Sequence, residues 1–165
     1  MSSEPKVVLR APVPRDLEDW FLFQLDQEAN EMAAFTSENP QDRKAYIDSW
    51  TEKLERPTVF MRTILAKDQV VGSVGSFDMF GQRELTYWIG REFWGRGYAT
   101  QSLHFFLGLE KTRPIFARAA SHNKGSCRVL EKCGFESIRE EVGFSQFLQR
   151  DVKEQVYELS APVSL

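Results

Sequence analysis

Three runs of strand-forming residues follow one another in the middle of the chain and restrict its fold more than any other feature. They cover residues 59–65, 70–79 and 84–89, and each is rich in β-branched or aromatic side chains. The segments between them, around residues 67–69 and 80–82, are short and carry polar or glycine residues that are typical of tight turns. The pattern predicts a three-stranded antiparallel meander.

Helical patterns lie on both sides of this meander. Before it, we expect a strand at residues 7–9, a helix that begins after Asp16 as its N-cap, and a helix over residues 42–55 that Pro57 ends. After it, residues 98–109 are apolar on nearly every side, which predicts a helix buried against the sheet. The remaining pattern predicts a strand at 114–119, a helix at 123–133 that Gly134 ends, and strands at 135–142 and 152–159.

The composition limits the classes of function. The 165 residues suit one domain, which we place over residues 1–165, with loosely ordered ends at 1–5 and 161–165. A net charge of −3 argues against a nucleic-acid binder. No apolar run is long enough for a membrane span and no leader is visible, so we expect a cytoplasmic protein with no membrane partner. Cys127 and Cys133 lie on different faces of a predicted helix, so we expect reduced packing residues and no metal site.

The heptad Trp94-Gly-Arg-Gly-Tyr-Ala-Thr100 stands between a predicted strand and a predicted helix. Its glycines allow the main chain to approach a ligand closely, and the N–H groups at the start of the next helix attract an anion. A pyrophosphate fits this description. Two other phosphate motifs do not match, because the third glycine of a dinucleotide fingerprint is replaced by Thr100 and no Gly-Lys-Ser/Thr follows. A plain strand-to-helix turn is the alternative for the heptad taken alone.

Three motifs in register resemble those of the GNAT-superfamily acetyltransferases, and most closely the RimJ/RimL-type branch. They are Leu85-Thr-Tyr-Trp-Ile89, the heptad, and Asn123-Lys-Gly-Ser-Cys-Arg-Val-Leu-Glu-Lys-Cys-Gly-Phe135, which together cover about a third of the chain. The resemblance implies an α/β (α+β) fold with a mixed, mostly antiparallel sheet of about seven strands and about four helices, in the order β-α-α-β-β-β-α-β-α-β-β. It also implies acetyl-CoA as the co-substrate.

The resemblance assigns coenzyme contacts to three parts of the chain. The pyrophosphate would lie on the loop formed by Trp94, Gly95, Arg96, Gly97, Tyr98, Ala99 and Thr100, where Trp94 replaces the usual Gln or Arg. Asn123 would contact the pantetheine arm and Ser126 would lie near the thiol, although capping of the helix would by itself explain both residues. Backbone groups at Trp88 and Ile89 would hold the pantetheine amides and donate to the thioester oxygen.

Two side chains are candidates for proton transfer. Glu84 opens the strand at which related enzymes often carry an acidic residue, so we expect it to act as the base, directly or through water. A solvated carboxylate beside Arg83 is the alternative. The tyrosine that many family members use as the acid is replaced by Leu130, which leaves Ser126 or a water molecule to protonate the thiolate.

The sequence therefore predicts an N-acetyltransferase that moves acetyl from acetyl-CoA to a primary amine in a ternary complex, without a metal. An acyl-CoA-binding or sensing module without transferase activity is the alternative. The acceptor is either a small amine or a protein N-terminus, and the protein is a monomer or a homodimer. Phe35 is the best candidate for the wall of the acceptor pocket, because it follows the first helix on the expected acceptor side.

Overall fold

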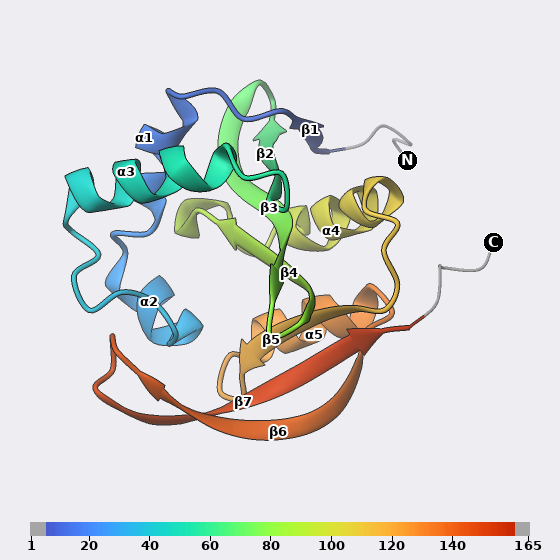
Figure 1. Ribbon diagram of the computed structural model, residues 1–165. Helices are drawn as coiled ribbons and strands as arrows, with labels where there is room; N and C mark the ends of the chain where they lie inside the picture. The colour runs from blue at the N-terminus through green and yellow to red at the C-terminus, as the bar shows by residue number, and fades with distance from the viewer. Residues whose placement is uncertain (1–5, 161–165) are drawn as a thin grey trace.

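A computed structural model describes residues 6–160, and a seven-stranded sheet forms its centre (Figure 1). The ends that were expected to be loose, residues 1–5 and 161–165, lie outside the described residues. The strands lie in the order β1-β2-β3-β4-β5-β7-β6. Their bounds are β1 Val8–Arg10, β2 Phe60–Ala66, β3 Gln69–Met79, β4 Gln82–Ile89, β5 Ile115–Ala120, β6 Glu136–Ser145 and β7 Arg150–Leu159.

Every neighbouring pair of strands is antiparallel except β4 and β5. The predicted meander is β2, β3 and β4, and the turn between β3 and β4 places Phe80 and Gly81 at positive φ. The parallel pair is short, because only Glu84 with Phe116 and Leu85 with Ala117 are in register. Beyond Leu85 the two strands separate, and the sheet opens between them.

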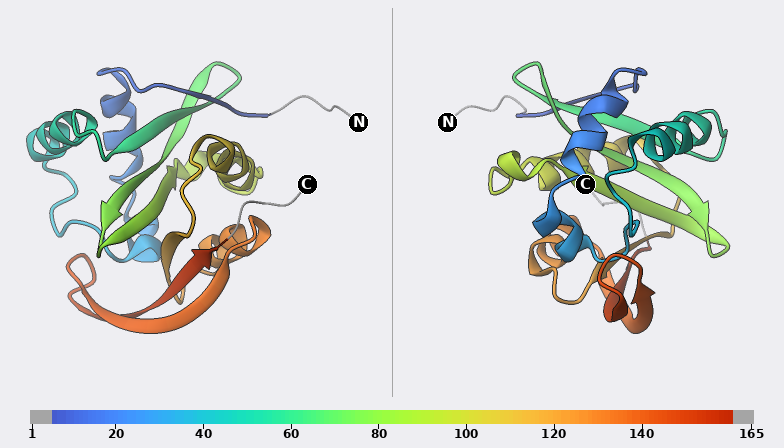
Figure 2. Two further views of the ribbon diagram at one scale, coloured as in Figure 1. Left: turned by 45° about the vertical axis from the view of Figure 1, so that its right-hand side comes forward. Right: turned by 90° about the vertical axis from the view of Figure 1, so that its left-hand side faces the viewer.

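Helices cover both faces of the sheet (Figures 1 and 2). On one side lie α1 Asp16–Phe23, α2 Gln27–Ala33 and α3 Arg43–Leu54, and Trp20 of α1 packs edge-on against Trp50 of α3. On the other side lie α4 Tyr98–Leu109 and α5 Lys124–Lys132, and a single 3₁₀ turn, Arg91–Phe93, leads from β4 toward α4. Helix α4 buries one face, including Leu103 and Phe106, whereas Phe105 and Leu109 are exposed, so it is less enclosed than its sequence predicts.

The predicted α/β (α+β) fold and element order are confirmed, and the structure adds one helix to them. Helix α2 has seven residues with little apolar periodicity, which is why the sequence pattern missed it; Asp26 caps it by accepting a hydrogen bond from the Ala29 N–H. The N-cap role predicted for Asp16 is wrong. Asp16 is a buried carboxylate inside the first turn of α1, where it accepts hydrogen bonds from Arg10 and Thr63.

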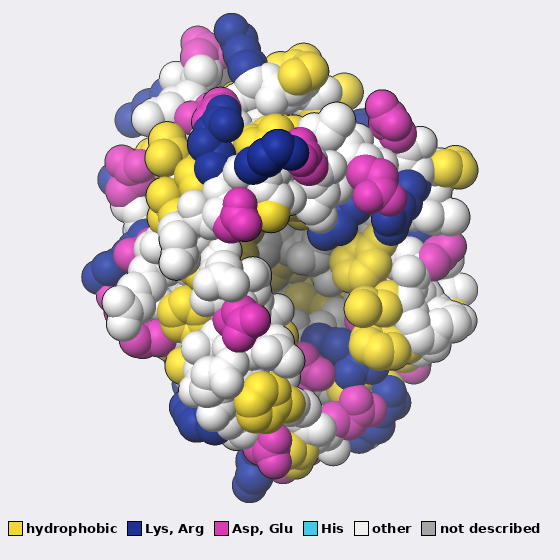
Figure 3. Space-filling model, turned by 60° about the vertical axis from the view of Figure 1, so that its left-hand side comes forward, with side chains coloured by type: hydrophobic (Ala, Val, Ile, Leu, Met, Phe, Trp, Pro, Cys, Tyr) yellow, Lys and Arg dark blue, Asp and Glu magenta, His cyan; other side chains and the backbone are white. Residues whose placement is uncertain are grey.

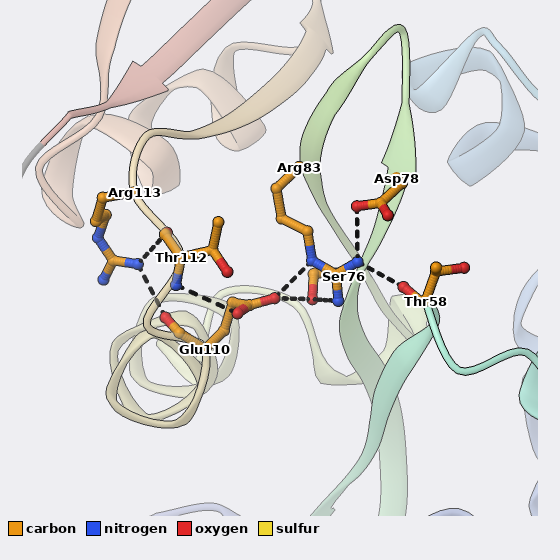
Figure 4. Close-up of polar contacts among 7 residues, drawn as sticks. All are labelled: Thr58, Ser76, Asp78, Arg83, Glu110, Thr112 and Arg113. Carbon is orange, nitrogen blue, oxygen red and sulfur yellow. Dashed lines mark hydrogen bonds and ion pairs between the residues drawn. The ribbon is translucent and has the colours of Figure 1, made fainter.

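A network of ion pairs ties the β3–β4 hairpin to the end of α4 (Figure 4). Glu110 accepts hydrogen bonds from Ser76 and from Arg83 Nε, and Arg83 also donates to Asp78. Burial raises the pKa of Glu110, but these hydrogen bonds outweigh it and hold the pKa below its ordinary value. The network fixes the hairpin on which Glu84 lies.

Within residues 6–160, no helix is both long and apolar enough to cross a bilayer.

Candidate active site

A cleft of about 900 Å³ occupies the opening between β4 and β5 and brings together nearly all the side chains selected from the sequence. Figure 3 shows the molecule hollowed on the side that carries α1, α2 and α3, with hydrophobic and charged side chains around the hollow. The predicted residues that line the cleft are Phe35, Glu84, Trp88, Ile89, Trp94, Gly95, Gly97, Tyr98, Ala99, Thr100, Asn123 and Ser126. Arg96 is outside the lining; its guanidinium lies over the Phe93 ring and 3.4 Å from the Glu92 carbonyl oxygen.

The glycine loop has the geometry of an anion site. Gly95 and Gly97 adopt φ values of 78° and 79°, a region that only glycine enters without strain, and α4 begins directly afterwards at Tyr98. As the first turn of a helix, residues 98–100 have N–H groups with no partner inside α4. The Trp94 indole donates a hydrogen bond of 2.8 Å to the Ile89 carbonyl oxygen, which attaches the loop to the end of β4.

The end of β4 presents backbone groups to the opening. The Gly90 N–H bonds the Val71 carbonyl oxygen on β3 at 2.9 Å. Because neighbouring residues of a strand direct their backbone groups to opposite sides, the groups of Trp88 face β3 as well, and those of Tyr87 and Ile89 face the opening. Ile89 is therefore better placed than Trp88 to offer a main-chain N–H to a ligand in the cleft.

Ser126 lies in the first turn of α5 and pairs with a tyrosine from the sheet. Asn123 caps this helix, since its Oδ1 accepts a hydrogen bond of 3.2 Å from the Ser126 N–H. The Ser126 hydroxyl lies 2.7 Å from the Tyr87 hydroxyl, and burial raises the pKa of Tyr87 to about 12. Tyr87 therefore stays protonated at neutral pH and fixes the Ser126 oxygen in the cleft.

Glu84 belongs to a cluster of charged side chains on the face of β4 opposite to Tyr87. It is 3% exposed, so its sequence-based alternative, a solvated carboxylate, is wrong. Arg118 of β5 lies 3.3 Å from Glu84, 3.2 Å from Glu154 and 2.8 Å from Glu141. Burial raises the pKa of Glu154, against the lowering effect of Arg118. The neighbouring Arg83 takes no part in this cluster, because it turns to Glu110 on the other face.

Three functional side chains were missed from the sequence, those of Tyr87, Arg118 and Glu154. Strand alternation does separate Tyr87 from Glu84, because residues an odd number apart on a strand face opposite ways. Strand alternation predicts the face of the sheet on which each side chain lies, but it does not predict which residue that side chain contacts. The contacts of Tyr87 with Ser126 and of Arg118 with Glu154 depend on how α5 and β7 dock, which no local pattern indicates.

Both cysteines are buried free thiols. Burial raises the pKa of Cys133 to about 11, and Cys127 is absent from the lining of the cleft. Over the described part of the chain, no cluster of three or more His, Cys, Asp and Glu side chains is arranged to hold a metal ion.

Comparisons with known proteins agree with this geometry. Residues 6–136 match the family model described as an acetyltransferase (GNAT) domain. No curated protein matches the chain.

Several solved structures share the fold. A Vibrio cholerae spermidine N-acetyltransferase in complex with CoA and spermine is 14% identical with a TM-score of 0.81, over 95% of this chain and 96% of that one. RimL, a ribosomal L7/L12 alpha-N-protein acetyltransferase in complex with coenzyme A, is 15% identical with a TM-score of 0.78, over 99% of this chain and 98% of that one. Mycobacterium smegmatis RimJ is 18% identical with a TM-score of 0.75, over 94% of this chain and 82% of that one.

Proposed function

Since the chain belongs to the GNAT acetyltransferase family, the acetyl-CoA-dependent N-acetyltransferases, we propose that it transfers acetyl directly to a primary amine in a ternary complex. The observation that carries the proposal is the opening between β4 and β5, flanked by the glycine loop on one side and by Ser126 on the other. Both ends of a coenzyme would find partners there. The pyrophosphate would lie on the N–H groups of residues 95–100, and the pantetheine arm would run along Ile89 toward Asn123.

An amine that arrives as an ammonium ion must lose one proton before it can attack the thioester carbonyl carbon, and its nitrogen loses a second when the amide forms. We assign the removal of these protons to Glu84, directly or through a water molecule that passes the first one to solvent, because Glu84 is the more deeply buried of the two carboxylates that line the cleft. The Ile89 N–H would stabilise the oxyanion of the tetrahedral intermediate. A main-chain donor suits this role because its position is fixed before the charge develops.

Collapse of the intermediate breaks the carbon–sulfur bond and leaves CoA as a thiolate. Ser126, oriented by the Tyr87 hydroxyl 2.7 Å away, would pass a proton to that sulfur while it takes one from a water molecule, or would position a water molecule that protonates the sulfur. A thiolate is a stable leaving group, so a weak acid is sufficient. Cys127 takes no part, and no covalent acetyl-enzyme is expected.

We also propose a family branch, a cellular location and an oligomeric state for the protein. The three sequence motifs and the shared fold of RimL and RimJ support a place in the RimJ/RimL-type branch. A cytoplasmic location and a monomeric or homodimeric state complete the proposal. An acyl-CoA-binding or sensing module is disfavoured, because the carboxylates at the far end of the cleft suit an amine acceptor, which binding of the coenzyme alone does not require.

The test combines coenzyme binding with product detection. Calorimetry should show that acetyl-CoA binds, and mass spectrometry should detect acetylated amine and free CoA in equal amounts. Binding without transfer to any amine would support the sensing module instead, and a labelled acetyl-enzyme formed without acceptor would contradict the ternary complex. Glu84→Gln should lower kcat by about 10²- to 10⁴-fold while acetyl-CoA still binds. An unchanged kcat across pH would remove Glu84 as the base.

A further inference from the structure

The half of the cleft remote from the glycine loop is lined by apolar side chains. Met32 of α2 and Phe35, which follows this helix, lie on one side, and Phe77 and Met79 of β3 lie on the other. Phe35 and Met79 are 38% and 48% exposed, so they present apolar surface at the rim. Such surface is unfavourable in water unless a ligand covers it.

The charge cluster lies in this same half of the cleft. Glu84 and Glu154 both line it, and Arg118 lies between them. Counted with the neighbouring Glu141, which also pairs with Arg139, three carboxylates meet two guanidinium groups. One negative charge is left over. The Glu154 side chain is only 15% exposed, so that excess charge is poorly solvated.

We propose that the acceptor is a monoamine with an alkyl or aralkyl body: its single ammonium group is held by Glu154 and Glu84, and its apolar body lies between Met32, Phe35 and Phe77. This inference rests on the proposed function and names the substrate class of the same site. One positive charge balances the excess negative charge of the cluster, and the apolar walls gain by losing contact with water.

The same lining disfavours the other two acceptor classes. A polyamine would place its further ammonium groups among Met32, Phe77 and Met79, where the described lining offers no carboxylate, and an unpaired charge is costly to bury. A peptide would bring N–H and C=O groups that need partners, and the hydroxyl side chains of this half are those of Thr36 and Thr86.

The test compares amines of matched size, with CoA release as the readout and full-length protein saturated with acetyl-CoA. Along a series from propylamine to heptylamine, kcat/KM should rise about fourfold per methylene group until the cleft is filled. Heptylamine should exceed 1,6-diaminohexane, which has the same number of heavy atoms and one more charge, by at least about tenfold. Spermidine and a tetrapeptide with a free N-terminus should be poorer still.

Three variants separate the charge from the apolar walls. Glu154→Gln should lower kcat/KM for heptylamine by about tenfold or more, the loss of a hydrogen bond to a charged group, with acetyl-CoA affinity unchanged. Glu158→Gln, on the same strand and outside the lining of the cleft, is the matched control and should match the wild type. Met32→Ser should flatten the chain-length series, lowering kcat/KM for heptylamine more than for propylamine.

The outcomes separate the two proposals. If spermidine, the diamine or the peptide is acetylated better than heptylamine, or if kcat/KM does not depend on chain length, the acceptor class is wrong and the transferase stands. If acetyl-CoA binds and none of the amines is acetylated, or if acetyl-CoA does not bind, the proposed function fails and the acceptor class fails with it.

Discussion

Replacing Arg118 by methionine tests the charge cluster as a structural unit. Methionine keeps an unbranched chain that reaches about as far as the arginine Nε but removes the cation from between Glu84, Glu141 and Glu154. The side chains of Glu84 and Glu154 are 4% and 15% exposed, so both carboxyl groups would lose their cation in a place with little access to water. Glu141 is 39% exposed and would be solvated, so its share of the loss is small.

The expected cost follows from this burial. Removing one partner of a buried ion pair lowers stability by about 3–5 kcal/mol, because the remaining charge is uncompensated. For a chain of this size each kcal/mol lowers Tm by about 2–4 °C, so Arg118→Met should unfold about 6–20 °C earlier. The added substitution Glu84→Gln should recover part of the lost stability, since it removes one of the carboxylates that Arg118 no longer neutralises.

Urea unfolding at pH 7, followed by circular dichroism, measures this difference. Arg139→Met is the matched control, because Arg139 also pairs with Glu141 but its side chain is 47% exposed; it should cost less than about 1 kcal/mol. If Arg118→Met is as stable as Arg139→Met, Glu84 and Glu154 do not depend on Arg118, and the description of the cluster is wrong.

Two further changes test other parts of the molecule. Glu110 has a pKa that burial raises but that hydrogen bonds from Ser76 and Arg83 hold below its ordinary value of 4.5, so it stabilises the fold above pH 4.5 and loses that contribution as pH falls below it. Glu110→Gln should therefore cost about 1.5–3 kcal/mol at pH 7 and much less in acid unfolding experiments; an equal cost at both pH values would contradict this. Tyr87→Phe should lower kcat about two- to tenfold, the worth of one hydrogen bond, with acetyl-CoA affinity unchanged. If Tyr87 acts through Ser126, the double variant Tyr87→Phe, Ser126→Ala should be no slower than Ser126→Ala alone, and an additive loss would separate the two residues.

The parts of the fold that local chemistry dictates were predictable from the sequence. Helix α4 begins and ends as predicted, because Gly97 in a left-handed conformation precedes a helix with a strongly apolar buried face. The β3–β4 hairpin follows from its turn residues and strand-forming side chains. Helix α2 was missed since its stability comes from a cap and from its packing, with Ala29 and Asn30 buried, and little from an apolar stripe.

The part of the site proposed to bind the coenzyme, around residues 94–100, was more predictable than the part proposed to bind the acceptor, around Glu84 and Glu154. Glycines and a helix start are local features, so the loop at residues 94–100 could be found by inspection. The acceptor half combines α2, β3, β5 and β7, and Glu154 approaches Glu84 only because β7 pairs with β5 and Arg118 bridges them. Contacts of this kind are set by tertiary packing and leave no periodic signal.

A crystal structure of the protein with CoA and heptylamine would show whether the opening between β4 and β5 holds both substrates of the transfer. We expect the pyrophosphate to contact the N–H groups of residues 95–100, the thiol to lie between Ile89 and Ser126, and the amine nitrogen to approach Glu84 and Glu154. A pyrophosphate bound away from the glycine loop, or a pantetheine arm that does not enter the opening between β4 and β5, would contradict this expectation.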